Sequence, residues 1–285
     1  MPGDVKAVCG WGGGVQSTTI GLMVLLGRLP RPDAFIFADT GDEPDEVYEH
    51  TGKWAVRFAA AGLAFYTVRH PSGQSLSEHV LARASAGKGG ISMPPVYVPR
   101  EASRGRMPVW RGCTRDFKVV PIERKLKALM DGWGIKWRGY RGAPQVEHWL
   151  GISHDERQRM KTSTESWRRF AHPLADRRMT RTDCIALLKR HGETAPRSAC
   201  VYCPFHSDAE WRRIAALPRE LDKAVAFEEA LQAAHNQHGA VAGLRGYPTL
   251  HPSGVPLRER PFDARQLRLG EWQDWRNECA GVCGV

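Results

Sequence analysis

The sequence predicts an α/β fold: a doubly wound, mainly parallel sheet with helices on both faces and a helical, cysteine-bearing C-terminal region. Three observations predict it. Short apolar segments alternate with helical ones over the first seventy residues, a glycine-rich turn follows the first apolar segment, and five of the seven cysteines lie beyond residue 180. Strands that alternate with helices are typical of parallel sheets. A chain of 285 residues suffices for one large α/β domain or for a core with a smaller appendage.

The boundaries of the expected elements follow from hydrophobic periodicity and from glycine or proline at their ends. The predicted strands are Val5–Cys9, Ala34–Ala38, Leu63–Val68 and His148–Ile152. The predicted helices are Thr18–Leu26, Glu46–Ala61, Phe117–Met130, Arg181–His191, Ala209–Ala216 and Arg219–Asn236. In the second of these helices, the expected inward residues are Val47, Trp54, Val56 and Phe58. Periodicity is lost from residue 84 to residue 112, where a basic lid and a flexible loop are both consistent with the composition.

Composition restricts the class of protein. No apolar run approaches the roughly 18 residues that span a bilayer, and the first residues lack the order of a signal peptide. We therefore expect a cytoplasmic protein without a membrane partner, in which cysteines serve metal or redox chemistry and not disulfides. The net charge of +10 favours a polyanionic partner. A basic surface that only aids solubility is the alternative.

The turn after the first strand has the composition of a phosphate-binding loop. Gly12, Gly13 and Gly14 allow backbone amides to approach phosphate oxygens at a helix N-terminus, and Ser17 and Thr18 add hydroxyl groups. The loop lacks the lysine of a Walker A motif and the third glycine of a dinucleotide-binding motif. An ordinary tight turn is the alternative.

The second strand is followed by polar residues, at the edge where parallel sheets bind ligands. Asp39 is expected to bind a ribose hydroxyl or a metal, or else to cap the next helix. The predicted nucleotide-binding residues are Gly12, Gly13, Gly14, Gln16, Ser17, Thr18, Asp39 and Thr40.

Four segments together resemble one family. Gly12–Thr18 resembles the PP-loop of ATP pyrophosphatases, and Ala38–Pro44 resembles the Asp-Thr-Gly segment of phosphoadenosine-phosphosulfate (PAPS) reductases. Cys113–Pro121 is similar to that family's Cys-x-x-x-x-Lys-x-x-Pro element, and Gly151–Arg159 to its element ending in Glu-Ser-x-x-Arg. The chain thus resembles the PAPS reductase-like family of the PP-loop (adenine nucleotide alpha-hydrolase) superfamily.

The resemblance implies ATP or a related adenine nucleotide, with Mg²⁺, as cofactors. By the same resemblance, the expected catalytic residues are Lys118, Asp155, Glu156 and Arg159. Two positions depart from the family loop: Gly12 stands where serine is usual, and Gln16 stands where aspartate is usual. The family's tail with a reactive cysteine, similar to Glu-Cys-Gly-Leu-His, is not present. On these grounds we predict that residues 1–160 form the nucleotide-binding core and residues 161–285 a mainly helical region packed on it.

The cysteine pattern indicates a metal site. Cys200 and Cys203 have the Cys-x-x-Cys spacing of metal ligands. The resemblance implies a [4Fe–4S] cluster on Cys113, Cys200 and Cys203; Cys283 is predicted as the fourth ligand, with Cys184, Cys279 or an open iron as alternatives. Zinc, completed by His206 or His191, is the other metal that such ligands suit. Cys9 is expected to be a buried strand residue.

Basic residues are dense between residues 157 and 190. Trp167 lies beside Arg168 and Arg169, a combination suited to phosphate contacts and base stacking. A solvated basic surface is the alternative. We accordingly expect DNA or tRNA as a partner.

The leading functional hypothesis is that ATP adenylates an acceptor for sulfur transfer to a nucleic acid. A cysteine desulfurase or another sulfur or electron donor would then be a second partner. The alternatives are a sulfonucleotide (PAPS or APS) reductase and a non-catalytic nucleotide-sensing or nucleic-acid-binding protein with a structural metal. The departures at Gly12 and Gln16 favour the last alternative.

Overall fold

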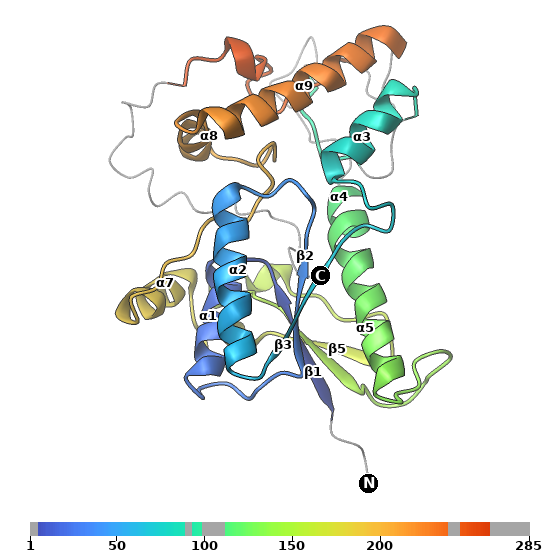
Figure 1. Ribbon diagram of the computed structural model, residues 1–285, viewed down its shortest axis with the longest axis vertical. Helices are drawn as coiled ribbons and strands as arrows, with labels where there is room; N and C mark the ends of the chain where they lie inside the picture. Colours follow the sequence, from blue (N-terminus) through green and yellow to red (C-terminus); the bar gives the residue numbers. More distant parts are fainter. Residues whose placement is uncertain (1–4, 89–92, 99–111, 239–245, 263–285) are drawn as a thin grey trace.

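The described residues form an α/β fold around a parallel sheet, as the sequence predicts (Figure 1). The computed structural model describes residues 5–88, 93–98, 112–238 and 246–262. Its five-stranded sheet has the order β3-β2-β1-β4-β5, and every paired strand is parallel. The strands are β1 (Lys6–Trp11), β2 (Ala34–Ala38), β3 (Ala64–Val68), β4 (Val146–Trp149) and β5 (Arg168–Ala171).

The order of the strands creates a crevice beside β1. The chain runs from β1 outward to β2 and β3, and then returns to the other side of β1 for β4 and β5. Val8 is therefore paired with Ala34 of β2 and with His148 of β4. In doubly wound sheets, ligands bind at the carboxyl ends of the two strands where the direction of winding reverses. The segments after β1 and β4 meet at that place.

The six predicted helices are all present, and α3 (Leu76–Ser85) is a longer helix that was not predicted. The longer ones are α1 (Val15–Leu25), α2 (Asp45–Ala60), α3 (Leu76–Ser85), α5 (Val120–Gly132), α7 (Arg181–Arg190), α8 (Asp208–Ala215) and α9 (Pro218–His238). The short elements are α4 (Gly112–Thr114), the π-helix η1 (Arg115–Val119), the 3-10 helix η2 (His154–Arg159), α6 (Pro173–Asp176) and the 3-10 helix η4 (Leu257–Glu259). α3 begins with a capping box formed by Ser75 and Glu78, which satisfies amides at the helix start.

Two apolar layers and a separate helical cluster hold the molecule together. On one face of the sheet, α1, α2 and α7 pack around Trp11, Phe35 and Phe58, while α5 covers the other face (Figure 1). A third core joins α3, α8 and α9, and it includes Phe117 of η1 and Tyr202. This helical cluster lies beyond the carboxyl edge of the sheet (Figure 1), so the edge that binds ligands in such folds is covered by α3, α8 and α9.

The structure also differs from the sequence-based expectations. Val56 is 70% exposed, and its predicted inward position is wrong because it lies two residues from both Trp54 and Phe58, on the opposite side of α2. Strand β5 was not predicted, and it joins the sheet although it follows residue 160. The division into two domains remains a prediction. No helix in the described ranges is long and apolar enough to cross a membrane.

Candidate functional site

The glycine loop between β1 and α1 requires its glycines. Gly13 has a φ of +76°, and a Cβ atom there would lie 3.0 Å from the Thr51 Oγ1 atom. A Cβ atom on Gly14 would lie 3.3 Å from the Ser198 Cβ atom. Only glycine tolerates this backbone conformation and this close approach without strain. Because α1 has no side-chain cap and no acidic residue in its first turn, its N-terminus favours an anion.

The loop hydroxyl groups have partners within the protein. The Ser17 hydroxyl donates to the Gly14 carbonyl oxygen over 3.1 Å, and Thr18 Oγ1 lies 2.9 Å from His50 Nε2. Thr18 is completely buried, and burial lowers the pKa of His50 to about 4. These hydroxyls therefore hold the start of α1 in place, a role that the loop composition alone does not indicate.

Four side chains form a polar group that we call the glycine-loop network: Gln16, Glu156, Arg159 and Arg181. Gln16 Nε2 donates to Glu156 Oε2 over 3.0 Å, and Arg181 Nη1 donates to Gln16 Oε1 over 3.1 Å. Arg159 Nη1 pairs with Glu156 Oε1 at 2.8 Å. The amide of Gln16 thus links a carboxylate that follows β4 to a guanidinium of α7, across the crevice beside β1.

The segment after β4 approaches α1 so closely that it also needs glycine. A Cβ atom on Gly151 would lie 3.2 Å from both the Gln16 Cβ atom and the Ser17 nitrogen. Asp155 accepts a hydrogen bond of 3.1 Å from the backbone nitrogen of Arg181 and so ties η2 to the start of α7. The structure therefore brings Gln16, Glu156 and Arg159 together. Asp155 stabilises the position of η2, the element that carries Glu156 and Arg159.

Asp39 organises its own loop. Its Oδ1 atom accepts from the Gly41 nitrogen and the Tyr48 hydroxyl, each over 2.8 Å. Its Oδ2 atom accepts from Arg69 Nε over 2.8 Å and from Arg69 Nη2 over 2.6 Å. Burial, followed by the Asp39 charge, raises the pKa of Tyr48, so the phenol remains a donor. Because two donors reach each oxygen, Asp39 serves as an anchor for residues 39–43 in this arrangement.

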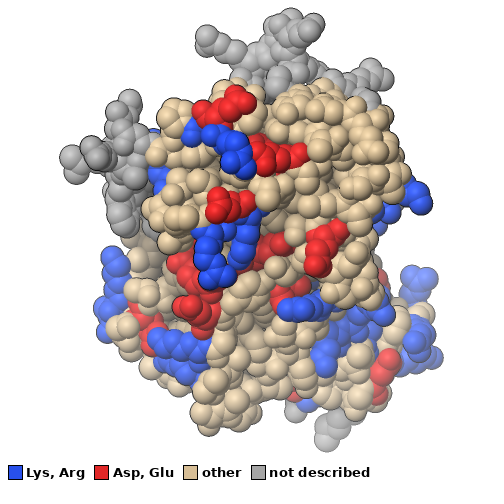
Figure 2. All heavy atoms as spheres, turned by 45° about the horizontal axis from the view of Figure 1, so that its top comes forward, with Lys and Arg blue, Asp and Glu red and all other residues tan. Residues whose placement is uncertain are grey.

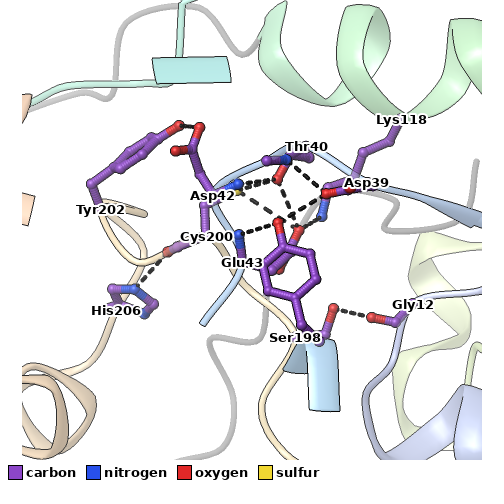
Figure 3. A network of polar contacts seen from close by, with 12 residues as sticks. Gly12, Asp39, Thr40, Asp42, Glu43, Lys118, Ser198, Cys200, Tyr202 and His206 are labelled. Atoms are coloured by element: carbon purple, nitrogen blue, oxygen red, sulfur yellow. Dashed lines mark hydrogen bonds and ion pairs between the residues drawn. The ribbon is translucent and has the colours of Figure 1, made fainter. Parts of the chain in front are cut away.

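Three of the predicted metal ligands line one space, which we call the cysteine cavity. Cys113, Cys200 and Cys203 share it with Thr40, Lys118 and apolar side chains. Its volume is about 30 Å³. Thr40 Oγ1 lies 3.5 Å from Cys200 Sγ (Figure 3). Burial, followed by the charge of Glu43, raises the pKa of the Cys200 thiol.

The cysteine cavity fits a thiolate-bound metal group in its chemistry, since thiolates bind both zinc and iron–sulfur clusters. Among the described residues, no three His, Cys, Asp or Glu side chains are placed to hold one ion. The thiols therefore line a common space without converging on a single point. A cavity of about 30 Å³ has room for only a few small atoms, so a four-iron cluster enters only if the surrounding side chains move.

The other candidate ligands have different positions. Cys184 is fully buried in the core between α1 and α7, and burial raises its pKa to about 12. Cys9 is a buried strand residue, as predicted. Cys279 and the predicted fourth ligand Cys283 lie outside the described residues.

His206 supports the turn that carries the cysteines. Its Nε2 atom lies 3.0 Å from the carbonyl oxygen of Cys200 and 3.1 Å from that of Val201, so this nitrogen is the donor. Burial lowers the pKa of His206 to about 4, and the ring packs edge-on against Trp211. These bonds occupy Nε2, while Nδ1 is buried without a hydrogen-bond partner among the described residues, so His206 as a zinc ligand stays a prediction. His191, at the C-terminal end of α7, is exposed and does not line the cysteine cavity.

The cysteine turn also contacts the glycine loop. Ser198 donates a hydrogen bond from its hydroxyl to the Gly12 carbonyl oxygen, two residues before Cys200 (Figure 3). On its other side, the Val201 nitrogen donates to the Asp42 carbonyl oxygen over 3.0 Å. The segment 198–203 therefore spans from the glycine loop to the cysteine cavity.

Sequence reasoning missed Glu43, Tyr202 and Arg181. Glu43 is 2% exposed and pairs with Lys118 at 3.0 Å. The Tyr202 hydroxyl donates to Asp42 Oδ2 over 2.6 Å (Figure 3). Glu43 lies in the polar run after β2, which was its available signal. Arg181 offered none, because its role depends on the packing of α7 against α1.

The prediction that Trp167 and its neighbouring arginines contact bases and phosphates is wrong for Trp167 and Arg168, which are both buried. Trp167 is 1% exposed, and its Nε1 atom donates to Glu165. Arg168 is also buried, where it pairs with Glu123 at 2.8 Å. The reason is that Arg168 belongs to β5, so it is covered by the sheet and α5. Arg169, on the other face of that strand, is more exposed and pairs with Glu147.

The sequence matches no protein-family profile, and it matches no curated protein.

Proposed function

We propose that the protein is a PP-loop enzyme of the PAPS reductase-like type, which uses ATP to adenylate an acceptor for sulfur transfer. The observation that carries the proposal is the contact between the glycine loop and the cysteine turn. Ser198 is hydrogen-bonded to Gly12, and Cys200 lines a cavity with Cys113 and Cys203. A phosphate-binding loop beside three thiols suits a reaction that combines nucleotide cleavage with sulfur chemistry.

The nucleotide would bind at the crevice beside β1. The amides of Gly12, Gly13 and Gly14 and the N-terminus of α1 suit the phosphates. Arg159, which is only partly buried, supplies positive charge at the same place. Mg²⁺ bound to the phosphates would neutralise the developing pyrophosphate charge further.

The reaction balances in two steps. An oxygen of the acceptor attacks the α-phosphorus of ATP, and pyrophosphate leaves. Sulfide delivered by a donor then displaces AMP, which carries away the acceptor's oxygen. An iron–sulfur cluster held by Cys113, Cys200 and Cys203 would supply sulfur-binding chemistry when bound; zinc is the alternative metal. Lys118 lies at the cysteine cavity and pairs with Glu43, so its expected contribution is at the sulfur end of the site.

The acceptor we favour is a nucleic acid, DNA or tRNA, because the net charge is +10. On the face formed by the helical cluster, however, charges of both signs alternate (Figure 2). Arg213 pairs there with Glu46 and Glu210, and Lys223 pairs with Asp45. Such a mixed surface does not attract a polyanion strongly, so we expect the nucleic acid to contact another face.

Two measurements test the proposal. Pyrophosphate release from labelled ATP is expected in the presence of DNA or tRNA, and the absence of release with every nucleic acid tried would contradict adenylation. Anaerobic purification followed by quantification of iron, sulfide and zinc is expected to give iron and sulfide. One zinc per chain without iron would remove the sulfur-transfer step.

A second candidate is a nucleotide-sensing protein without catalysis. The position of Gln16 favours it, since both polar atoms of this amide already bind Glu156 and Arg181. A sensor would bind ATP and release no pyrophosphate, so the labelled-ATP measurement separates the two candidates.

A further inference from the structure

Exposed basic side chains gather where η2 meets α6. Four of them form what we call the arginine surface: Arg157, Lys161, Arg177 and Arg178. The first two belong to η2 and to the residues just after it, and the last two directly follow α6. The short helix α6 packs against η2, and the His154 nitrogen donates to the Met179 carbonyl oxygen over 2.7 Å. The turn that carries Arg177 and Arg178 therefore lies beside η2.

The charges of the arginine surface are not neutralised within the described ranges, where none of its four side chains forms a salt bridge. Arg177 donates to a backbone carbonyl oxygen over 3.3 Å, which leaves its charge uncompensated. The exposed acids of η2 and α6 are Asp155 and Asp176, so four positive charges stand against two negative ones. On the face of the helical cluster, by contrast, Arg213 and Lys223 are paired with acids (Figure 2). The arginine surface is therefore the better of the two for a polyanion.

The end of α6 places an arginine where glycine is usual. The Arg178 nitrogen donates to the Ala175 carbonyl oxygen over 2.9 Å, and Arg178 has a φ of +56°. The Met179 nitrogen donates to the Leu174 carbonyl oxygen, also over 2.9 Å. The same pair of bonds ends α1, α2, α3, α5 and α7, and there the residue at positive φ is always a glycine: Gly27, Gly62, Gly87, Gly134 and Gly192. Glycine adopts this conformation without strain, so the chain keeps a charged side chain at a strained, exposed position.

The arginine surface adjoins the glycine-loop network. The helix η2 carries Arg157 together with Glu156 and Arg159 of that network. The turn after α6 leads into Arg181, whose backbone nitrogen donates to Asp155 Oδ1 over 3.1 Å. A polyanion on the arginine surface would therefore lie next to the crevice beside β1. Guanidinium groups bind phosphate oxygens through two parallel hydrogen bonds, so three arginines among four basic residues favour a chain of phosphates.

We infer that the arginine surface binds the phosphate backbone of a nucleic acid and holds it beside the crevice next to β1. The inference rests on the proposed function for the nature of the polyanion, and it names the face that the nucleic acid contacts. Contacts to phosphates position a nucleic acid without reading its sequence. Binding at this surface should therefore depend on salt and little on sequence.

The test uses Arg178→Gly and Arg157→Gln in the full-length protein. Arg178→Gly removes a charge and at the same time relieves the strained backbone, so weaker binding by this variant cannot come from a damaged fold. Lys223→Gln is the matched control, since it removes one exposed positive charge from the face of the helical cluster. Fluorescence anisotropy titrations with a labelled duplex DNA and with a labelled tRNA, each at several salt concentrations, give the affinities. Thermal unfolding of each variant gives its stability.

Arg178→Gly and Arg157→Gln are each expected to weaken DNA binding about fivefold at about 0.15 M salt, and the double variant about 25-fold. Each single change should also reduce the slope of log affinity against log salt concentration by about 0.9 for duplex DNA and by about 0.7 for single-stranded segments of tRNA. The melting temperature of Arg178→Gly should equal or exceed that of the wild type, and Lys223→Gln should bind like the wild type.

Unchanged affinity in Arg178→Gly and Arg157→Gln, with a wild type that binds DNA or tRNA, would overturn the inference and leave the proposed function intact. An equal loss in Lys223→Gln would overturn it too, because net charge alone would then account for binding. A wild type that binds neither nucleic acid at low salt would also overturn it. Weaker binding by the two arginine variants, in a protein that releases no pyrophosphate from ATP, would support the arginine surface and contradict the proposed reaction.

Discussion

The glycine-loop network and the cysteine cavity lie at the same edge of the sheet, yet they are built differently. The network is polar, and Gln16 connects Glu156 to Arg181 through both atoms of its amide. The cavity has mostly apolar walls, with three thiols and one buried ion pair between Glu43 and Lys118. The network combines two guanidinium groups with one carboxylate, whereas the lining of the cavity is mostly apolar apart from its thiols and Lys118.

This difference has an energetic consequence. A buried ion pair has lost its hydration, so removal of one partner leaves an uncompensated charge and destabilises the whole protein. In the glycine-loop network, Gln16 and Arg181 are buried, but Glu156 and Arg159 keep about a fifth of their side-chain surface exposed and can rearrange with water. Changes at the cysteine cavity should therefore reduce stability most, while changes at the glycine-loop network should mainly reduce ligand binding.

The largest expected effect is that of Lys118→Met. The substitution leaves Glu43 buried without its cation, and we expect the free energy of unfolding to fall by about 3–5 kcal/mol. Urea denaturation measures it. The double variant with Glu43→Gln should recover most of the loss, because neither charge remains. Lys53→Met, which removes an exposed lysine paired with Glu193, should cost less than about 1 kcal/mol. Equal losses for Lys53 and Lys118 would show that burial does not make the Glu43–Lys118 pair more costly to break.

The next effect concerns how far the free energy of unfolding falls in acid because of a histidine in β4, the strand that precedes Glu156 and Arg159. His148 of β4 is buried, neither ring nitrogen has a hydrogen-bond partner in the described residues, and burial lowers its pKa from 6.5 to about 3. Above pH 6.5 the ring is neutral in both folded and unfolded chains, so it gives no pH dependence. As the pH falls from 6.5 towards 3, only the unfolded chain binds the proton, and stability falls by about 1.4 kcal/mol per pH unit.

His148→Leu should remove that part of the acid dependence. Urea denaturation at pH 7 and pH 5 is expected to show a smaller difference for this variant, by about 2 kcal/mol. His191→Leu, at an exposed position, serves as the control. If the wild type and His148→Leu lose the same stability between these two pH values, acid sensitivity arises elsewhere, and the strand beneath the network is not its source.

A smaller effect distinguishes the glycine loop from an ordinary turn. Gly13 and Gly27 both have positive φ angles, of +76° and +68°. Gly13→Ala adds a Cβ atom 3.0 Å from Thr51 Oγ1, whereas a Cβ atom on Gly27 meets nothing within 4 Å. Gly27→Ala should therefore cost only the backbone strain, about 1–2 kcal/mol, and Gly13→Ala more. Thermal unfolding measures both, and equal losses would show that the loop accommodates a side chain.

The two sites also differ in how far the sequence predicts them. The glycine loop follows directly after a buried strand, so periodicity and turn composition locate it. Glu156 and Arg159 were expected from the family resemblance of Gly151–Arg159. The sheet, α1, α2 and α5 follow from the same patterns. Strand β5 could not be predicted from these patterns, because its two arginines indicated an exposed surface. Arg168 is nevertheless buried, where it pairs with Glu123.

Contacts between distant segments were not predictable in this way. Glu43 meets Lys118 across 75 positions and Cys200 across 157. The motifs placed Cys113, Cys200 and Cys203 in one group, and the structure places them around one cavity. The polar run between β2 and α2 contains Glu43, but nothing in that run indicated that this side chain would meet the cysteine turn. Its role depends on where η1 and the cysteine turn pack.

The smallest expected effect tests the glycine-loop network itself. Gln16→Glu replaces the amide that donates to Glu156 Oε2 over 3.0 Å with a second carboxylate. Loss of this bond and repulsion between the two acids should weaken ATP binding roughly tenfold, or about 1.4 kcal/mol. Calorimetric titration with ATP and Mg²⁺ measures the affinity. Gln74→Glu adds the same charge at an exposed position of the chain and should leave affinity unchanged. Equal or tighter binding by Gln16→Glu would mean that the network tolerates the carboxylate usual in PP-loops, and that the glutamine is not what adapts this site to its ligand.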